Sequence, residues 1–192
     1  MGNRKEPGSL FFFEPDLYQT LRDSITMLPI EMKKKIVDKI AHAESPREQA
    51  IDVMTEMQNY YGYMSDEAMV EAGELLGMTP LELEELATFY NFIYRQPVGK
   101  YVIHICDSTV CWMNGYESLL DYLCSLLNVE LGGTSSDGLF TLLPVCCLGY
   151  CDHAPAMIIN REIYGELTPE KIERIIGKLR DRAYSAEKGI GE

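Results

Sequence analysis

Four of the six cysteines in this chain form two closely spaced pairs, and these pairs constrain the fold more than any other feature. Four residues separate Cys106 from Cys111, and three separate Cys147 from Cys151. Thirty-five residues lie between Cys111 and Cys147. Thiols grouped in this way are typical of metal sites, so we expect the fold to bring two distant loops together around one centre.

The composition limits the class of protein further. Of the 192 residues 46% are hydrophobic and 10% aromatic, which is enough to bury a core without a disulfide framework. The net charge of −13 argues against a nucleic-acid partner, because phosphate binding needs a basic surface. We find no apolar run long enough to span a bilayer and no signal-peptide pattern. We therefore expect a cytoplasmic protein without direct membrane insertion, in a compartment where clustered thiols favour metal over disulfides.

The first half of the chain has no cysteine, and its patterns indicate helices. Ser45-Pro46-Arg47-Glu48 and Thr79-Pro80-Leu81-Glu82 each resemble a capping box with proline at the first helical position. Short connections between helices predict a small bundle over residues 29–95. The expected helices cover residues 30–43, with Met32, Ile36, Val37 and Ile40 on one face, residues 45–61, residues 65–76, and a segment that begins at Thr79.

The aromatic stretch over residues 89–94 leads into Arg95-Gln96-Pro97-Val98-Gly99. We interpret the aromatic side chains as packing between the two halves of the chain; a docking surface for another subunit is the alternative. Pro97 and Gly99 mark the boundary between the halves, because both residues interrupt regular structure.

The second half changes to a pattern of short strands and helices. Residues 101–105 and 140–145 predict strands that each deliver cysteines at the carboxyl end. The remaining expected elements are a helix over residues 115–127 with Leu119, Leu120, Leu123 and Leu127 inward, a hairpin of residues 156–159 and 163–164, and a helix from Thr168 to about Arg180. This order predicts a small mixed sheet covered by helices, as in thioredoxin-like domains.

The identity of the metal depends on the spacing. Structural zinc sites usually use C-x2-C knuckles, whereas spacers of four and three residues suit a 2Fe–2S cluster, in which each iron takes two thiolates. A catalytic thiol pair lacks its usual C-x-x-C spacing. The chemistry leaves open whether Cys146 or Cys147 pairs with Cys151. Cys124 is expected to be a buried apolar residue, and His153 is not expected to be a ligand, because Rieske centres need two histidines.

Several motifs together resemble a known family. They are Ala87-Thr88-Phe89-Tyr90, the Arg95-Gln96-Pro97-Val98-Gly99 segment, Cys106-Asp107-Ser108-x-x-Cys111 and Cys147-Leu148-Gly149-x-Cys151. In this combination and order they resemble the small 2Fe–2S subunit of NADH:quinone oxidoreductase, respiratory complex I. The resemblance covers residues 29–180.

The resemblance implies an α+β fold, in which an N-terminal helical bundle is followed by a thioredoxin-like α/β ferredoxin domain. The expected divisions are an N-terminal extension over residues 1–28, the bundle over 29–95, the 2Fe–2S domain over 96–181 and a flexible tail over 182–192. The resemblance also implies the ligand set for one 2Fe–2S cluster, which selects Cys147 over Cys146. The four implied ligands are Cys106, Cys111, Cys147 and Cys151.

The resemblance further implies a role in electron transfer without a catalytic residue or substrate site in this chain. The implied partner is the larger subunit that binds FMN, NADH and a 4Fe–4S cluster, and through it the chain is expected at the cytoplasmic face of the inner membrane. This chain carries no glycine-rich phosphate loop, in agreement with that division of labour. We also expect backbone N–H groups of residues 107–110 and 148–150 to point at the sulfurs.

Two other functions remain open at this stage. An equivalent 2Fe–2S subunit serves soluble NAD-linked hydrogenases or formate dehydrogenases, and this chain alone contains nothing that separates that context from complex I. A zinc-stabilised interaction module without redox activity is the more distant alternative.

Overall fold

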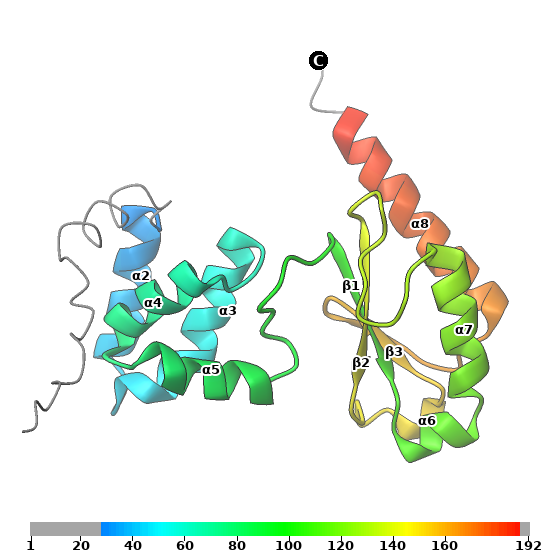
Figure 1. Ribbon diagram of the computed structural model, residues 1–192, viewed down its shortest axis with the longest axis horizontal. Helices are drawn as coiled ribbons and strands as arrows, with labels where there is room; N and C mark the ends of the chain where they lie inside the picture. Colours follow the sequence, from blue (N-terminus) through cyan, green and yellow to red (C-terminus); the bar gives the residue numbers. More distant parts are fainter. Residues whose placement is uncertain (1–27, 189–192) are drawn as a thin grey trace, which may run out of the picture.

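A computed structural model describes residues 28–188 of the chain, with the side chains of residues 186–188 left out, and the predicted N-terminal extension lies outside these residues apart from Leu28. The described residues form a helical part and a sheet-containing part, joined by an extended linker (Figure 1). Their buried apolar residues fall into separate clusters, one of residues 28–93 and a main one of residues 101–183. These clusters support a division near residue 95, which we retain as a proposal.

The helical part contains four α-helices and one 3₁₀ turn among the described residues. Their buried faces share a core that includes Met54, Met57 and Leu83, each with 0% exposure. The elements are α2 (Ile30–Ala41), η1 (Pro46–Gln49), α3 (Ala50–Tyr61), α4 (Asp66–Leu76) and α5 (Pro80–Phe89).

The sequence signals for these helices were right in part. Ser65 accepts a hydrogen bond from the Ala68 N–H, and Thr79 forms the full capping box with Glu82. Ser45 makes no side-chain cap, and the turn after it is 3₁₀ rather than α-helical, which corrects the predicted start at that residue. Val37 was also placed wrongly: it is 48% exposed, because one residue beyond the buried Ile36 turns about 100° away from the core.

One four-stranded sheet, in the order β2-β1-β3-β4, organises the second part. Strand β1 (Tyr101–Cys106) runs parallel to β2 (Phe140–Val145) and antiparallel to β3 (Met157–Ile159), which pairs with β4 (Glu162–Tyr164). Asn160 adopts a φ of 52° in the tight turn of this last hairpin, a conformation that asparagine tolerates better than most residues. The strands and the hairpin were predicted correctly.

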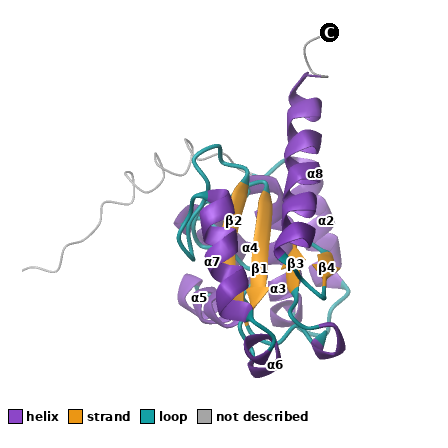
Figure 2. Ribbon diagram, turned by 90° about the vertical axis from the view of Figure 1, so that its right-hand side faces the viewer, coloured by secondary structure: helices purple, strands orange, loops and turns teal. Residues whose placement is uncertain are grey.

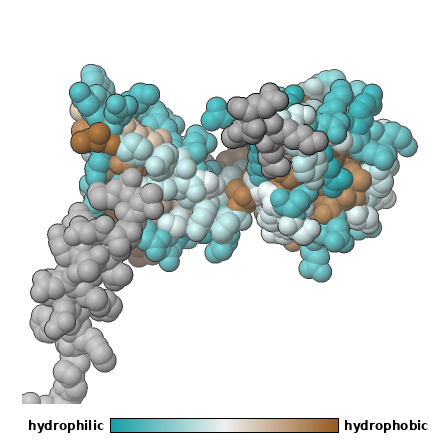
Figure 3. Space-filling view, turned by 90° about the horizontal axis from the view of Figure 1, so that it is seen from above, coloured by the Kyte–Doolittle hydropathy of each residue, from teal (hydrophilic) through white to brown (hydrophobic). Residues whose placement is uncertain are grey.

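Helices α7 (Tyr116–Leu127) and α8 (Pro169–Lys188) cover one face of this sheet, and the helical part lies on its other side (Figures 1 and 2). Leu119, Leu123 and Leu127 of α7 are buried as predicted, and Leu120 is partly buried. In the space-filling view, hydrophilic side chains cover most of the visible face of both parts, and apolar side chains appear only in small patches (Figure 3).

Helix α8 is longer than the sequence predicted. It continues to Lys188, so the segment expected to be a tail from residue 182 is helical over most of its length. Ala183 is fully buried in the same cluster as Ile176 and Leu179, which places it on the apolar stripe of the helix. The stripe therefore extends beyond Arg180, and no glycine or proline ends the helix there.

The linker is fixed to both parts by hydrogen bonds and ring contacts. The Gln58 side chain of α3 donates to the Phe92 carbonyl (2.8 Å) and accepts from the Tyr94 N–H (2.6 Å). The rings of Phe92 and Tyr94 lie against His104 of β1, with centroid separations of 4.7 and 5.9 Å. The predicted packing between the halves is therefore present at these two rings, whereas Phe89 is 77% exposed.

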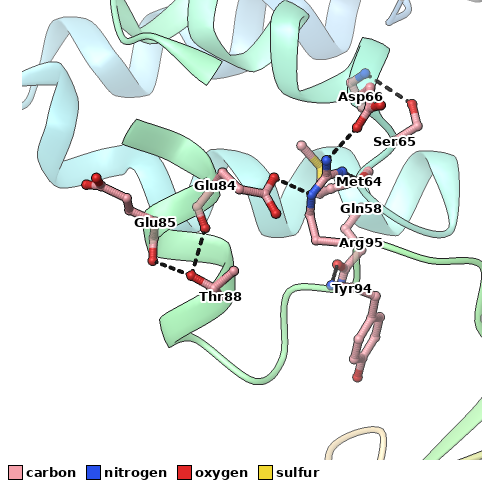
Figure 4. A network of polar contacts seen from close by, with 10 residues as sticks. Gln58, Met64, Ser65, Asp66, Glu84, Glu85, Thr88, Tyr94 and Arg95 are labelled. Atoms are coloured by element: carbon pink, nitrogen blue, oxygen red, sulfur yellow. Dashed lines mark hydrogen bonds and ion pairs between the residues drawn. The ribbon is translucent and has the colours of Figure 1, made fainter. Parts of the chain in front are cut away.

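Arg95 anchors the linker to the helical part (Figure 4). Its guanidinium group donates to Glu84 Oε2 (2.7 Å), to Asp66 Oδ1 (2.6 Å) and to the Met64 carbonyl. At the other end of the linker the Gly99 N–H donates to Thr141 Oγ1 (2.6 Å), and a Cβ at Gly99 would lie 2.9 Å from the β2 backbone. The linker motif therefore attaches the helices to the sheet at both ends.

Candidate metal centre

The parallel strands β1 and β2 bring the two cysteine pairs to the same edge of the sheet. Cys106 is the last residue of β1 and is in register with Val145, the last residue of β2. Because the carboxyl ends of parallel neighbours meet at one edge, the loops that follow them lie side by side. Cys111 lies in the short helix α6 (Thr109–Met113), and Cys151 begins the 3₁₀ turn η2 (Cys151–His153).

The four thiols form one group made of two pairs. Cys147 Sγ and Cys151 Sγ are 3.3 Å apart, and the Cys106 thiol is near enough to Cys111 to raise the pKa of Cys111. The two pairs lie close together, because the charge of Cys106 acts on Cys151 and raises its pKa. In the described part of the chain no three His, Cys, Asp or Glu side chains are arranged around a single ion position. A donor set of two thiol pairs fits a 2Fe–2S cluster, in which each iron takes two protein sulfurs.

The two pairs differ in their burial. Cys106 and Cys111 are both 2% exposed, and they pack in a small cluster with Val145 and Ala156. Cys147 and Cys151 are exposed. One side of the centre is therefore closed by the protein, and the other side faces outward.

The environment of each thiol shifts its pKa in a different direction. Burial, followed by the hydrogen bond with Cys106, raises the pKa of Cys111 to about 11. The Gly149 N–H lies 3.4 Å from Cys147 Sγ and, together with Cys151, lowers the pKa of Cys147. Cys151 has a raised pKa because its hydrogen bond with Cys147 favours the protonated form. A bound cation is the natural partner for the thiolates that such a site would hold.

Backbone groups near the sulfurs agree in part with the sequence prediction. Gly149 donates to Cys147 as expected, and its φ of 75° is one that glycine adopts without strain. The backbone of Ala156, immediately before β3, also lies beside Cys111 and acts to lower the pKa of its thiol. Sequence reasoning missed Ala156, because only the pairing of β3 with β1 brings it beside the first cysteine loop.

Three residues near the four thiols, Cys146, Cys124 and His153, were also considered in the sequence analysis, and their environments differ. Cys146 is exposed, and among the described contacts none joins its sulfur to another thiol, which supports Cys147 as the partner of Cys151. Cys124 is partly buried against the core of the sheet part. The ring of His153 contacts the carboxylates of Asp152 (3.4 Å) and Glu166 (3.3 Å). The Ala154–Pro155 peptide bond is cis, and Ala154 is extended.

Exposed apolar side chains lie on α6, the short helix that also carries Cys111. Trp112 and Met113 are 56% and 73% exposed, and Val110 is 38% exposed. Sequence reasoning missed this surface, because the helix that carries it has only five residues. No helix among residues 28–188 is long and apolar enough to cross a bilayer.

Comparisons with known proteins agree with this geometry. The family model described as thioredoxin-like [2Fe-2S] ferredoxin matches residues 34–180. A subunit of the NADH-quinone oxidoreductase of Pseudomonas aeruginosa is 40% identical over 144 residues, which cover 75% of this chain and 87% of that protein. The corresponding subunit of the Escherichia coli K12 oxidoreductase is 40% identical over 148 residues, or 77% and 89% of the two chains.

A solved structure is also similar. The match is to a chain of an NAD+-reducing [NiFe]-hydrogenase in the air-oxidized state, with a TM-score of 0.58 and 25% sequence identity. It covers 68% of this chain but only 23% of the hydrogenase chain.

Proposed function

The chain belongs to the thioredoxin-like [2Fe-2S] ferredoxin family, and on this basis we propose that it is the electron-transfer subunit of an NADH-quinone oxidoreductase that carries a 2Fe–2S cluster. Membership of the family also confirms the predicted fold class, an N-terminal group of helices followed by a thioredoxin-like ferredoxin domain. The observation that carries the proposal is the meeting of two thiol pairs at the carboxyl ends of β1 and β2.

We assign the four ligands to Cys106, Cys111, Cys147 and Cys151. A 2Fe–2S cluster supplies reversible storage of one electron. The backbone N–H of Gly149 stabilises negative charge on the Cys147 sulfur, and the Ala156 backbone does the same at Cys111. Burial of Cys106 and Cys111 excludes water from one side of the centre, so that electrons exchange through the exposed side, where Cys147 and Cys151 lie.

The proposed partner is the larger subunit that binds FMN, NADH and a 4Fe–4S cluster. Trp112 and Met113 lie next to the cysteine loops, and together they offer the kind of exposed apolar anchors that protein interfaces use. We propose that the partner docks on this surface and places its flavin near the exposed pair of ligands. The chain would then be held at the cytoplasmic face of the inner membrane through the complex rather than by a segment of its own.

A second context is an NAD-linked hydrogenase or formate dehydrogenase. The similarity to the NAD+-reducing hydrogenase favours it, but the identity of 25% is lower than the 40% shared with the oxidoreductase subunits. The matched hydrogenase chain is also much longer than this one, since the match covers only 23% of it. We therefore prefer the membrane-associated NADH-quinone oxidoreductase to the hydrogenase or formate dehydrogenase as the complex that contains this chain.

The test is to isolate the chain anaerobically from its native cells, identify the proteins that accompany it, and add NADH. Proteins of an NADH-quinone oxidoreductase and an NADH-dependent paramagnetic signal from a 2Fe–2S cluster are expected. Recovery with nickel–iron hydrogenase proteins would support the second context instead. A colourless preparation with stoichiometric zinc would overturn both.

A further inference from the structure

A short connector, residues 165–167 between β4 and α8, is hydrogen-bonded to the loop that carries Cys151. The Glu166 N–H donates to the His153 carbonyl (2.6 Å), and the Leu167 N–H donates to the Pro155 carbonyl (3.1 Å). These two bonds attach the connector to the loop on both sides of Ala154. Because Cys151 begins the 3₁₀ turn that ends at His153, the connector holds the far end of the ligand turn itself.

Gly165 is the closest point of this attachment. A Cβ built on Gly165 would lie 2.6 Å from both the Cβ and the carbonyl oxygen of His153, and 2.7 Å from the ring of Tyr150. Gly165 does not have a positive φ, so the constraint is space rather than backbone conformation. One of the obstructing atoms belongs to the backbone of the ligand turn, so a side chain at this position cannot be accommodated by rotation of its neighbours alone.

Side chains of α8 and of the ligand turn also contact the connector. Lys171 Nζ donates to the Gly165 carbonyl (2.6 Å), and His153 Nδ1 lies 3.3 Å from Glu166 Oε1. The ligand turn, the connector and the start of α8 are therefore bonded in sequence. Any displacement of the connector toward the sheet edge is transmitted to Tyr150 and His153, the residues on either side of Cys151 and Asp152.

We propose that Gly165 is a positioning residue for the cluster, acting through the connector to set where Cys151 stands relative to Cys147. This inference rests on the ligand assignment made above. The exposed pair is where such a restraint matters, because Cys147 and Cys151 lack the packing that surrounds Cys106 and Cys111. Residues that orient metal ligands without touching the metal tune both the affinity and the electronic properties of a site.

The test compares the cluster-loaded full chain with Gly165→Ala and Gly165→Val, and uses Gly177→Ala as the matched control. Gly177 lies in α8, and a Cβ there meets no atom within 4 Å. The readouts are the g-values of the reduced cluster, its midpoint potential and the rate of iron release to a chelator. We expect the Gly165 variants to shift the g-values and the potential, with valine shifting both more than alanine. Iron release should be about 10–100-fold faster in Gly165→Val, and Gly177→Ala should match the wild type.

Identical g-values, potential and iron release in Gly165→Val and the wild type would overturn the positioning role while leaving the proposed function intact. A wild-type chain without a 2Fe–2S cluster would instead remove the proposed function, and the positioning role with it. If Gly165→Val fails to fold by circular dichroism, Gly165→Ala and Lys171→Met decide the question. The lysine variant adds no bulk but removes the bond to the Gly165 carbonyl, and unchanged spectra in both would reject the proposal.

Discussion

At the scale of single residues, the main feature is the unequal environment of the four thiols. Cys106 and Cys111 are enclosed by the protein, whereas Cys147 and Cys151 face outward and are 3.3 Å apart. Burial raises the pKa of Cys111, and a backbone N–H lowers that of Cys147. A centre held in this way is protected on one side and accessible on the other, as an electron carrier that must meet a partner requires.

The adjacent residues Cys146 and Cys147 give a matched pair of substitutions. Cys147→Ala should abolish the iron–sulfur absorbance, because it removes a sulfur that contacts Cys151. Cys146→Ala should retain the cluster, because the Cys146 side chain is exposed and is not one of the four assigned ligands. Absorbance and iron content of anaerobically purified variants check this prediction. Retention in Cys147→Ala together with loss in Cys146→Ala would reverse the ligand assignment.

At the scale of helices, strands and connections, the linker and the helix caps determine how the parts are held together. Arg95 has three partners in the helical part, and Gln58 bonds to the linker backbone at two points. These contacts place Phe92 and Tyr94 over His104, on the face of β1 that α7 and α8 do not cover. The linker therefore acts as a covering layer of the sheet as well as a connection.

Ser45 and Thr79 begin similar sequence motifs, but their replacement by alanine should affect stability differently. Thr79→Ala removes a capping box and should lower the free energy of unfolding by about 1 kcal/mol. Ser45→Ala should change it by only a few tenths, roughly, since Ser45 makes no cap hydrogen bond. Urea denaturation of both variants measures the difference. Equal losses would contradict the assignment of a stabilising cap to Thr79 alone of these two residues.

Two arginines provide a similar comparison. Arg95→Met should lower the free energy of unfolding by about 2 kcal/mol, because its largely covered guanidinium group binds two carboxylates and a carbonyl. Arg47→Met should cost under about 1 kcal/mol, because the ion pair of Arg47 with Glu82 is exposed. Denaturant titrations at low and high salt provide the measurement, and a larger loss at Arg47 would contradict the assigned role of Arg95.

The sequence predicted those elements whose signals are local. The strands β1 and β2, the hairpin of β3 and β4, and the caps at Ser65 and Thr79 follow from alternation and from residues within one turn. Features that depend on distant contacts were missed. The backbone of Ala156 approaches Cys111, and Gly165 approaches His153, only after the sheet has formed. The short helix α6 was missed because five residues are too few for a periodic pattern.

At the scale of the whole molecule, a chain with a net charge of −13 exposes several apolar side chains next to the thiols. Trp112 and Met113 lie on α6, between the first cysteine loop and the start of α7. The helical part lies on the opposite side of the sheet from α7 and α8 (Figure 1). One molecule thus combines a cluster site, a docking surface beside it and a separate group of helices.

The docking surface can be tested without altering the ligands. Trp112→Glu should weaken association with the flavin-binding subunit, because a charged residue replaces an exposed aromatic anchor; a loss of about 2 kcal/mol in binding free energy is expected. The cluster spectrum should be unchanged. Tyr184→Glu is a control, since Tyr184 is 48% exposed on α8 and lies outside the proposed surface. Interferometry measures the binding of each variant to the flavin-binding subunit. If both substitutions weaken binding equally, the result argues against docking at α6.

The content of iron and acid-labile sulfide in the full chain, purified without oxygen, tests the central claim most directly. If Cys106, Cys111, Cys147 and Cys151 hold a 2Fe–2S cluster, the protein should contain about two irons and two sulfides per chain, and reduction should produce the paramagnetic signal of such a cluster. One zinc per chain without labile sulfide would contradict the account.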